Sequence, residues 1–389
     1  MSQQIVNRIL KVSLFSGILL FFYSFYKNRS NSAFFLDYLS VYGYFISLSI
    51  GATFLILLMY LTRAGWGVAI KRIPEHIMSL LPIFALLFIP LLFGLDFIFE
   101  WLDADHIKHD PLIQRKLPYL NLPFFVIRNI IYFLVFSIIS MFYWRNSIQQ
   151  DKANNEETKN ITRKLQQRAP VSILLMSLVT SFASFDWLMS LYPHWFSTIF
   201  GIYYFAGCMV FILAITIIVY ELLLSFKAIE DYPNNEHFHD LSKLLYGFII
   251  FWSYVAFSQY FLTWYANIPE FTQWYYPRIH GEWESLFYIL MIFHFVVPLF
   301  GFMSRHVKRN RLGRLFFSFL IIIIHYLDIR FIVYPNFFEQ NVITSNEYIL
   351  ILSFSLILIP LVGFKIIKHS IIPENDPRLA ESKHLENAL

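Results

Sequence analysis

Ten apolar stretches, each long enough to cross a bilayer, constrain this chain more than any other feature of its sequence. The hydrocarbon layer of a membrane is about 30 Å thick, and a helix of about 20 apolar residues crosses it. Within lipid, segments of this length satisfy their backbone hydrogen bonds as helices. We therefore expect an all-α integral membrane protein with about ten transmembrane helices in one polytopic domain, 1–389. The expected spans are 8–26, 36–62, 76–99, 124–144, 169–191, 196–226, 239–266, 283–304, 312–335 and 347–369.

The composition excludes several classes of protein. Charged residues make up 14% of the chain, against about 25% in soluble domains. The single cysteine, Cys208, excludes a disulfide framework, a cysteine-ligated iron–sulfur cluster and a Cys-x-x-Cys-His haem attachment site. The net charge of +4 lies in the connecting segments, so it bears on topology and gives no sign of nucleic-acid binding. We expect no metal site, no covalently bound cofactor and no catalytic residue.

The distribution of Lys and Arg predicts the orientation. Cytoplasmic loops carry an excess of these residues, and most of the 30 in this chain fall on the side that the two termini share. We therefore expect both termini and the tail 370–389 in the cytoplasm. The first stretch lacks a small-residue cleavage site, so we interpret it as a span and not as a signal peptide. The expected outer segments, rich in aromatic residues and suited to an interfacial belt or a docking surface, are 100–121, 192–195 and 267–282.

The ten spans divide naturally into one, four, four and one. Spans 2–5, within 35–191, and spans 6–9, within 195–335, could form two similar four-helix bundles. The spans 8–26 and 347–369 would then be peripheral helices. The chain shows no tandem sequence repeat, so this expectation rests on the pattern of spans and on the frequency of duplicated bundles in membrane carriers.

Ionisable residues inside the spans are the candidate functional groups, because each costs about 2.5–3.5 kcal/mol at a helix centre. Asp186 lies near the outer end of span 5, where it could accept protons, cap the next element or hold an arginine. His194 lies in the Pro-His-Trp turn before span 6. It could exchange protons near neutral pH, or it could simply cap the turn.

Two histidines lie near the middle of neighbouring spans. His294 is in span 8 and His325 in span 9, and Asp328 follows His325 on the same helical face. Such a group could form a proton relay like those of membrane pumps. It could equally be a polar clamp that joins two helices. Two histidines at similar depth are also compatible with the axial ligands of a haem.

Three further residues complete the proton-pathway candidates. Asp96 lies at the outer end of span 3 and could pair with Arg128 of span 4. Glu221 lies at the inner end of span 6, where its side chain can reach the interface. Tyr254 belongs to a polar stretch of span 7, 253–260, that could hold a chain of waters or join helices by hydrogen bonds.

Three motifs carry a resemblance to a known family. They are FDWLMSLYPHWFSTIFGIYYFAG (185–207), WSYVAFSQYFLTWYANIPEF (252–271) and TRAGWGVAIKRIPE (62–75). They resemble stretches of the membrane subunits of alternative complex III, the bacterial quinol:cytochrome c oxidoreductase, which belong to the polysulfide-reductase-C-like (NrfD-like) family. The resemblance covers nearly the whole chain, and the length and number of spans are similar to those of the smaller of the two such subunits.

The resemblance implies a role in a respiratory chain. It implies two four-helix bundles of opposite orientation, one flanking helix at each end, and a place in the bacterial inner (cytoplasmic) membrane. It also implies partner subunits that carry haem c and iron–sulfur clusters, namely a multihaem cytochrome c and an iron–sulfur subunit. The larger related membrane subunit would oxidise quinol, while this chain, in contact with membrane lipids, would anchor the complex as a non-catalytic subunit and conduct protons. One departure is that a single acid, Glu270, follows the Asn-x-Pro stretch where we expect two, so a pocket formed there would be less acidic.

Two other functions stay open. A quinone-binding redox subunit could hold a quinone, or a lipid, among its aromatic side chains, with Asp186 or a histidine bonded to the quinone carbonyl. Spans 2–5 hold no histidine at mid-membrane, which favours a subunit that does not itself oxidise quinol. A stand-alone secondary transporter would have broken helices that face each other at the midplane. Here we expect mostly continuous spans, with interruptions only at Pro82, Pro90, Pro298 and Pro360.

Overall fold

The computed structural model describes residues 3–229 and 232–385, which form helices and connecting turns without any strand. Ten helical segments in this part of the chain are long and apolar enough to cross a membrane, so the all-α expectation with about ten spans is confirmed. Eight of these spans are formed by one long helix each. These are α1 (Gln3–Asn28), α2 (Ser32–Leu61), α8 (Leu122–Gln150), α9 (Asn155–Trp187), α10 (Phe200–Ser225), α11 (Asn235–Ala266), α16 (Arg311–Val333) and α17 (Ser345–Lys368).

The other two spans change helix type along their length, and the third also has a turn at Ser79 and Leu80. The third span consists of α3 (Arg72–Met78), α4 (Leu81–Phe88), the 3₁₀-helix η2 (Ile89–Gly94) and α5 (Leu95–Ile98). The eighth consists of the 3₁₀-helix η5 (Gly281–Trp283), α13 (Glu284–Ile289), the π-helix η6 (Leu290–Val296) and α14 (Val297–Met303). Pro82, Pro90 and Pro298 each lie in the first turn of a segment, and each lacks the N–H that would bond to a carbonyl of the turn before it.

Helices α2 and α10 form the centre of the molecule. The most apolar window of each is more than 70% buried, at 78% for α2 and 72% for α10. Their backbones touch at Gly51 of α2, where an added Cβ would lie 2.2 Å from the carbonyl oxygen of Cys208 on α10. Small residues permit such close packing between membrane helices.

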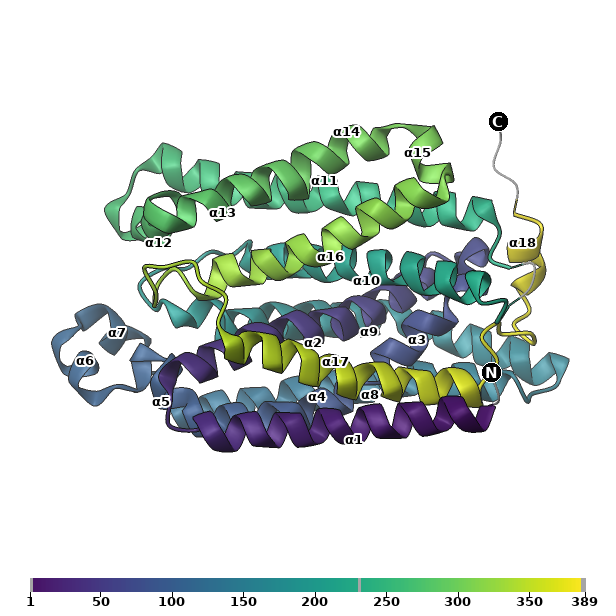
Figure 1. Ribbon diagram of the computed structural model, residues 1–389, viewed down its shortest axis with the longest axis horizontal. Helices are drawn as coiled ribbons and strands as arrows, with labels where there is room; N and C mark the ends of the chain where they lie inside the picture. The colour runs from purple at the N-terminus through teal and green to yellow at the C-terminus, as the bar shows by residue number, and fades with distance from the viewer. Residues whose placement is uncertain (1–2, 230–231, 386–389) are drawn as a thin grey trace.

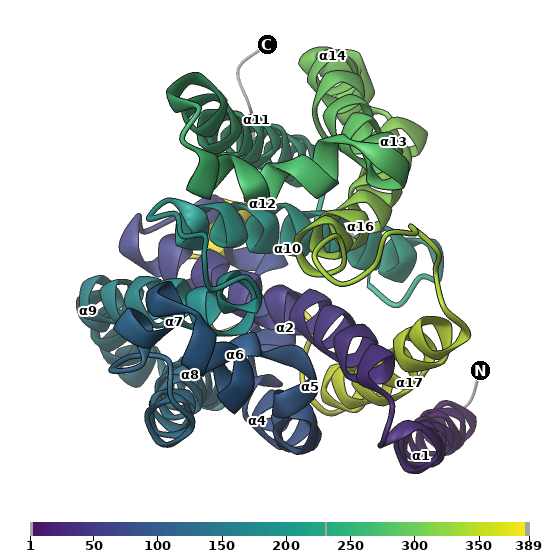
Figure 2. The same ribbon diagram turned by 90° about the vertical axis from the view of Figure 1, so that its left-hand side faces the viewer.

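The remaining spans surround this pair in chain order. Helix α2 packs on α3 and α9, α4 packs on α8, and α8 packs on α9. Helix α10 packs on α11 and α16, α11 packs on α14, and η6 packs on α16. The first and last spans, α1 and α17, lie side by side at one edge (Figure 2).

The two ends of the molecule differ. Both chain termini lie at one end, which we call the terminal end, as an even number of spans requires (Figure 1). The opposite end, which we call the distal end, carries the short helices α6 (Ala104–His109), α7 (Pro111–Lys116) and α12 (Pro269–Ile279). Asn267 ends α11 in the left-handed conformation, with φ 47°, and Pro269 begins α12. The chain therefore turns sharply and α12 lies across the distal end.

Candidate functional site

Asp328 of α16 is a buried acid held by two neutral side chains. Asp328 is 1% exposed. The Tyr203 hydroxyl donates a hydrogen bond to Oδ1, and the Trp252 indole N–H donates one to Oδ2 at 3.2 Å. No cation among the described residues forms an ion pair with it. Because a charge in the membrane core is costly unless it is compensated, these two hydrogen bonds are all that this structure offers to an ionised Asp328.

His294 is linked to Asp328 through Trp252. The His294 ring stacks on the Trp252 indole, with ring centroids 3.6 Å apart and an interplanar angle of 21°. The histidine is fully buried, and neither ring nitrogen finds a hydrogen-bond partner within the described part of the chain. It lies in the π-helix η6, a rare geometry that occurs often at functional sites. Trp252 thus stacks its ring on a histidine and donates its indole N–H to a carboxylate.

His325 points away from Asp328, although the two lie one helical turn apart. Its Nε2 is 3.0 Å from the Ser47 hydroxyl of α2, and Nδ1 has no partner in the described residues. Gly207 makes room for the ring, since an added Cβ there would lie 2.7 Å from it. The expected histidine–carboxylate pair is therefore not formed, because His325 faces α2 while Asp328 faces α10 and α11.

Asp186 holds an arginine, which was one of its three expected roles. Arg128 donates from Nε to Oδ2 at 2.7 Å and from Nη2 to Oδ1 at 3.0 Å. The Tyr132 hydroxyl adds a third bond at 2.8 Å. Asp96 is exposed and does not pair with Arg128, so that expected pair is wrong. The cause is geometric, because Asp186 presents both oxygens to the arginine from the neighbouring helix α9.

His194 pairs with a loop and not with Asp186. Its Nε2 is bonded to Asp110, whose Oδ1 also caps α7 by accepting from the N–H groups of Leu112 and Ile113. Burial alone would raise the pKa of Asp110, but the bonds from His194 and these backbone groups outweigh it and hold the pKa below its usual value. His194 therefore fastens its turn to the distal-end loop, a contact that differs from a cap on the turn itself.

Glu221 and Tyr254 occupy surroundings of opposite kinds. Glu221 of α10 binds Arg314 and, at 3.1 Å, Arg311, both at the start of α16. It is thus an ionic clamp between two helices at the terminal end. Tyr254 of α11 is 65% exposed and faces the side of the molecule.

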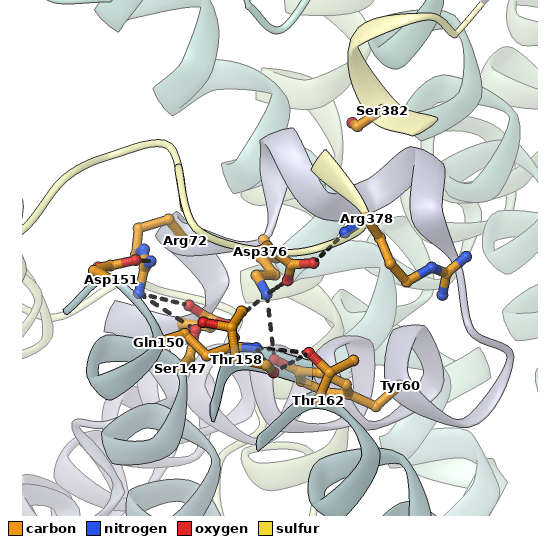
Figure 3. A network of polar contacts seen from close by, with 12 residues as sticks. Tyr60, Arg72, Ser147, Gln150, Asp151, Thr158, Thr162, Asp376, Arg378 and Ser382 are labelled. Atoms are coloured by element: carbon orange, nitrogen blue, oxygen red, sulfur yellow. Dashed lines mark hydrogen bonds and ion pairs between the residues drawn. The ribbon is translucent and has the colours of Figure 1, made fainter. Parts of the chain in front are cut away.

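A group of charges at the terminal end, all buried except the half-buried Asp151, was not among the sequence candidates. We call it the terminal-end cluster, and Figure 3 shows its surroundings. It consists of Lys71, Arg72, Glu75, Asp151 and Asp376. Arg72 binds Asp151 at 2.7 Å and Glu75 at 3.3 Å. Lys71 binds Asp376 and lies 4.0 Å from Glu75.

The pKa values at this cluster agree with a charged pair. Burial would lower the pKa of Lys71, but Tyr60, Asp376 and Glu75 raise it above its ordinary value. Burial would likewise raise the pKa of Asp376, but Lys71 holds it below its ordinary value. Both groups therefore carry their charge at neutral pH.

The C-terminal tail closes over this cluster. Besides Asp376, the tail contributes Ser382 of α18 (Leu379–Lys383), whose hydroxyl accepts from the Ala69 N–H at 3.1 Å and donates to the Trp66 carbonyl at 2.7 Å. His237 Nε2 lies 2.9 Å from the same hydroxyl. The feature of the sequence that indicates this cluster is the group of charges in TRAGWGVAIKRIPE. This segment lies just before an apolar stretch, and we expected it to be a connection between spans.

No protein-family model matches this chain, and no curated protein matches its sequence. The family resemblance is therefore carried by the motifs at 62–75, 185–207 and 252–271 alone, and these motifs contribute many of the buried groups described above.

Proposed function

We propose that this chain is a membrane subunit of a respiratory quinol:electron-acceptor oxidoreductase of the alternative complex III type. In this proposal the chain anchors the complex and conducts protons, while a related neighbouring subunit oxidises quinol. The observation that carries the proposal is Asp328, a buried acid bonded only to Tyr203 and Trp252 among the described residues.

A proton conductor needs buried groups that can change their charge. Asp186 is poorly suited, because protonating it would leave the Arg128 guanidinium without its partner. Asp328 can gain or lose a proton without abandoning a cation. His294 and His325 each retain at least one ring nitrogen without a partner in the described residues, and such a nitrogen can accept or donate a proton.

We also propose the architecture and setting that the resemblance implies. Spans 2–5 and spans 6–9 would form two four-helix bundles, with α1 and α17 as flanking helices. The contacts support this arrangement, because each set of four closes on itself, α2 meeting α9 in the first and α10 meeting α16 in the second. The chain would reside in the bacterial inner membrane with the terminal end in the cytoplasm, and its partners would carry haem c and iron–sulfur clusters.

The test is purification in a gentle detergent through a tag on this chain. We expect a multihaem cytochrome, an iron–sulfur subunit and a larger related membrane subunit to co-purify. Proton release per quinol oxidised would then be measured for Asp328→Asn, with the exposed Asp105→Asn as the control. We expect a lower ratio of protons to electrons only in Asp328→Asn. An intact complex with an unchanged ratio in Asp328→Asn would refute the conducting role.

A stand-alone secondary transporter is the second candidate, and one observation favours it. The helix type changes along the third and eighth spans, and irregular helices in two halves of a protein often mark a transporter site. The same purification separates the two functions. A colourless chain that purifies alone and moves a solute in vesicles would establish the transporter.

A further inference from the structure

We propose that a cavity at the distal end binds the phosphate group of an anionic phospholipid, one acyl chain of which lies along α9. The cavity is formed by α7, the end of the fifth span and the turn before α10. It shares no lining residue with the group around Asp328. The inference therefore goes beyond the proposed function and can be tested apart from it.

The cavity has the size of a ligand site and lies at the edge of the membrane. Its volume is about 370 Å³, within the range of about 300–1,000 Å³ that is usual for small-molecule pockets. Helix α7 lies over the distal ends of α8 and α9 (Figure 2). The fourth span begins at Leu122 and the fifth ends at Leu191, while Leu120, Met189 and Phe196 line the cavity. The cavity is therefore level with the headgroups of a surrounding bilayer.

Two cations line the cavity without an acid bound to either. Arg115 and Lys116 form the last turn of α7, and neither forms an ion pair with a described residue. The Lys116 ammonium donates one hydrogen bond to the Pro193 carbonyl, which leaves two of its three N–H donors. The acid that acts on it through charge, Asp110, is already bonded to His194. Two positive charges and free donors are thus available to an anion.

The pKa of Lys116 agrees with a cation that lacks a partner. Burial lowers the pKa of this half-buried ammonium, and the charge of Asp110 offsets only part of the effect. An anion bound in the cavity would compensate the same charge. The side chain also lies over the Phe196 ring, with Nζ 5.3 Å from the centroid, so its position in the cavity is fixed from two sides.

An exposed apolar stripe leads from the cavity into the membrane. Phe185 lines the cavity, and Phe182, Leu178, Leu175 and Val171 follow it on the same face of α9, three or four residues apart. These four are 43%, 57%, 43% and 60% exposed. At about 1.5 Å per residue the stripe extends about 21 Å, which exceeds half of the roughly 30 Å hydrocarbon layer. It is long enough for an acyl chain of one leaflet.

The combination of cations and stripe selects one ligand class. A free phosphate ion would use the cations and leave the stripe empty, and so would an acidic loop of a partner protein. A zwitterionic phospholipid would use the stripe, but its ammonium would be repelled by Arg115 and Lys116. An anionic phospholipid uses both, and two basic side chains near its headgroup should favour it at least tenfold.

The test uses the full-length protein, purified with any bound subunits and reconstituted into phosphatidylcholine vesicles. The probe is phosphatidylglycerol with a photoreactive diazirine in one acyl chain. We expect labelled peptides from 171–189, and displacement by unlabelled phosphatidylglycerol at one tenth or less of the amount of phosphatidylcholine needed. Soluble glycerol phosphate should not displace the probe.

Substitutions assign the label to the cavity. Lys116→Met should reduce labelling about fivefold, the effect of one basic side chain near an anionic lipid. Arg115→Gln should reduce it by a similar factor, and it removes no contact with a described residue, so it decides the matter if Lys116→Met alters the fold of α7. Lys108→Met on α6 is the control. Its side chain is 69% exposed and lies outside the cavity, so labelling should not change.

Four outcomes would overturn the inference. Equal displacement by phosphatidylcholine would show a lipid surface that does not distinguish headgroups. Displacement by glycerol phosphate would show an anion site that needs no acyl chain. Labelling that neither Lys116→Met nor Arg115→Gln reduces would place the lipid outside the cavity. Labelling of the isolated chain but not of the assembled complex would show that a partner protein occupies this place.

Discussion

The buried acids of this protein fall into two kinds. In the terminal-end cluster, Asp376 is paired with Lys71 and Asp151 with Arg72, and Glu75 lies between both cations. Asp328 of α16 has a hydroxyl and an indole as its partners and, among the described residues, no cation. The difference teaches that burial alone does not identify a group that exchanges protons. In the proposed function, the absence of a paired cation is the property that distinguishes Asp328 from the acids of the terminal-end cluster.

The energetics of the two kinds differ accordingly. Removing one partner from a buried ion pair leaves an uncompensated charge and costs about 3–5 kcal/mol. Hydrogen bonds between membrane helices are weaker, with a measured average of about 0.6 kcal/mol. Substitutions whose expected costs differ severalfold can therefore test whether the two kinds of acid are distinct.

The largest effect is expected for Arg128→Ala. This change leaves Asp186 buried without its cation, so we expect a loss of about 3–5 kcal/mol in the free energy of unfolding. Thermal unfolding in detergent measures it. The exposed Arg115→Ala is the control and should change stability by at most about 0.5 kcal/mol. Equal stability of both variants would show that the Asp186 pair is not structural.

Lys71→Met should have a large but local effect. Without Lys71, Asp376 loses its cation and the tail loses its main attachment to the terminal-end cluster. We expect trypsin to cleave after Arg378 at least tenfold faster, because the local opening of the tail is measured by this rate. The exposed Lys368→Met should leave the rate unchanged. If Lys71→Met also leaves the rate unchanged, the other contacts of the tail, those of Asn375 and Ser382, hold it closed.

Acid should release the same tail. The folded pKa of Asp376 lies below its ordinary value of about 3.9. Its ionised form therefore stabilises the closed tail above that value, and this contribution is lost as the pH falls through the lower folded pKa. Hydrogen exchange of peptides from 370–385, corrected for the intrinsic effect of pH, should show lost protection only below about pH 4. Loss of protection already at pH 6 would contradict the pair.

Asp328→Asn should have the smallest effect on stability. The amide retains an acceptor for Tyr203 or Trp252 and strands no cation, so we expect a loss of no more than about 1 kcal/mol. The matched variant Asp186→Asn strands Arg128 and should cost about 3–5 kcal/mol. A comparable loss in both variants would mean that Asp328 is a structural acid after all.

The sequence predicted the membrane spans well because their signal is one of length and polarity. Each stretch is close to the hydrocarbon thickness, and no neighbour is needed to recognise it. It did not predict the π-helix around His294, because no residue preference identifies a π-helix. Helix type changes at Pro82, Pro90 and Pro298 as expected, whereas the interruption expected at Pro360 is wrong, because α17 continues through it.

The candidate site was predicted only in part. Asp328, His294 and His325 were identified because titratable residues are rare in spans. Their partners could not be identified, since Trp252, Tyr203 and Ser47 belong to other helices whose rotations the sequence does not give. Asp376 lies 305 residues from Lys71 along the chain. No spacing rule connects residues so far apart, and the terminal-end cluster was missed for that reason.

The direct backbone contact at Gly51 limits how this molecule can move. A rocking motion that parted the two central helices would have to open the contact between Gly51 and the Cys208 carbonyl. Because Gly51 has no side chain, nothing at this position could fill the gap that opens. A bulky solute that could pass only if α2 and α10 separated would therefore pass poorly between these two helices. A proton needs no parting, because it advances when hydroxyl, imidazole and carboxyl groups exchange their bonds in place.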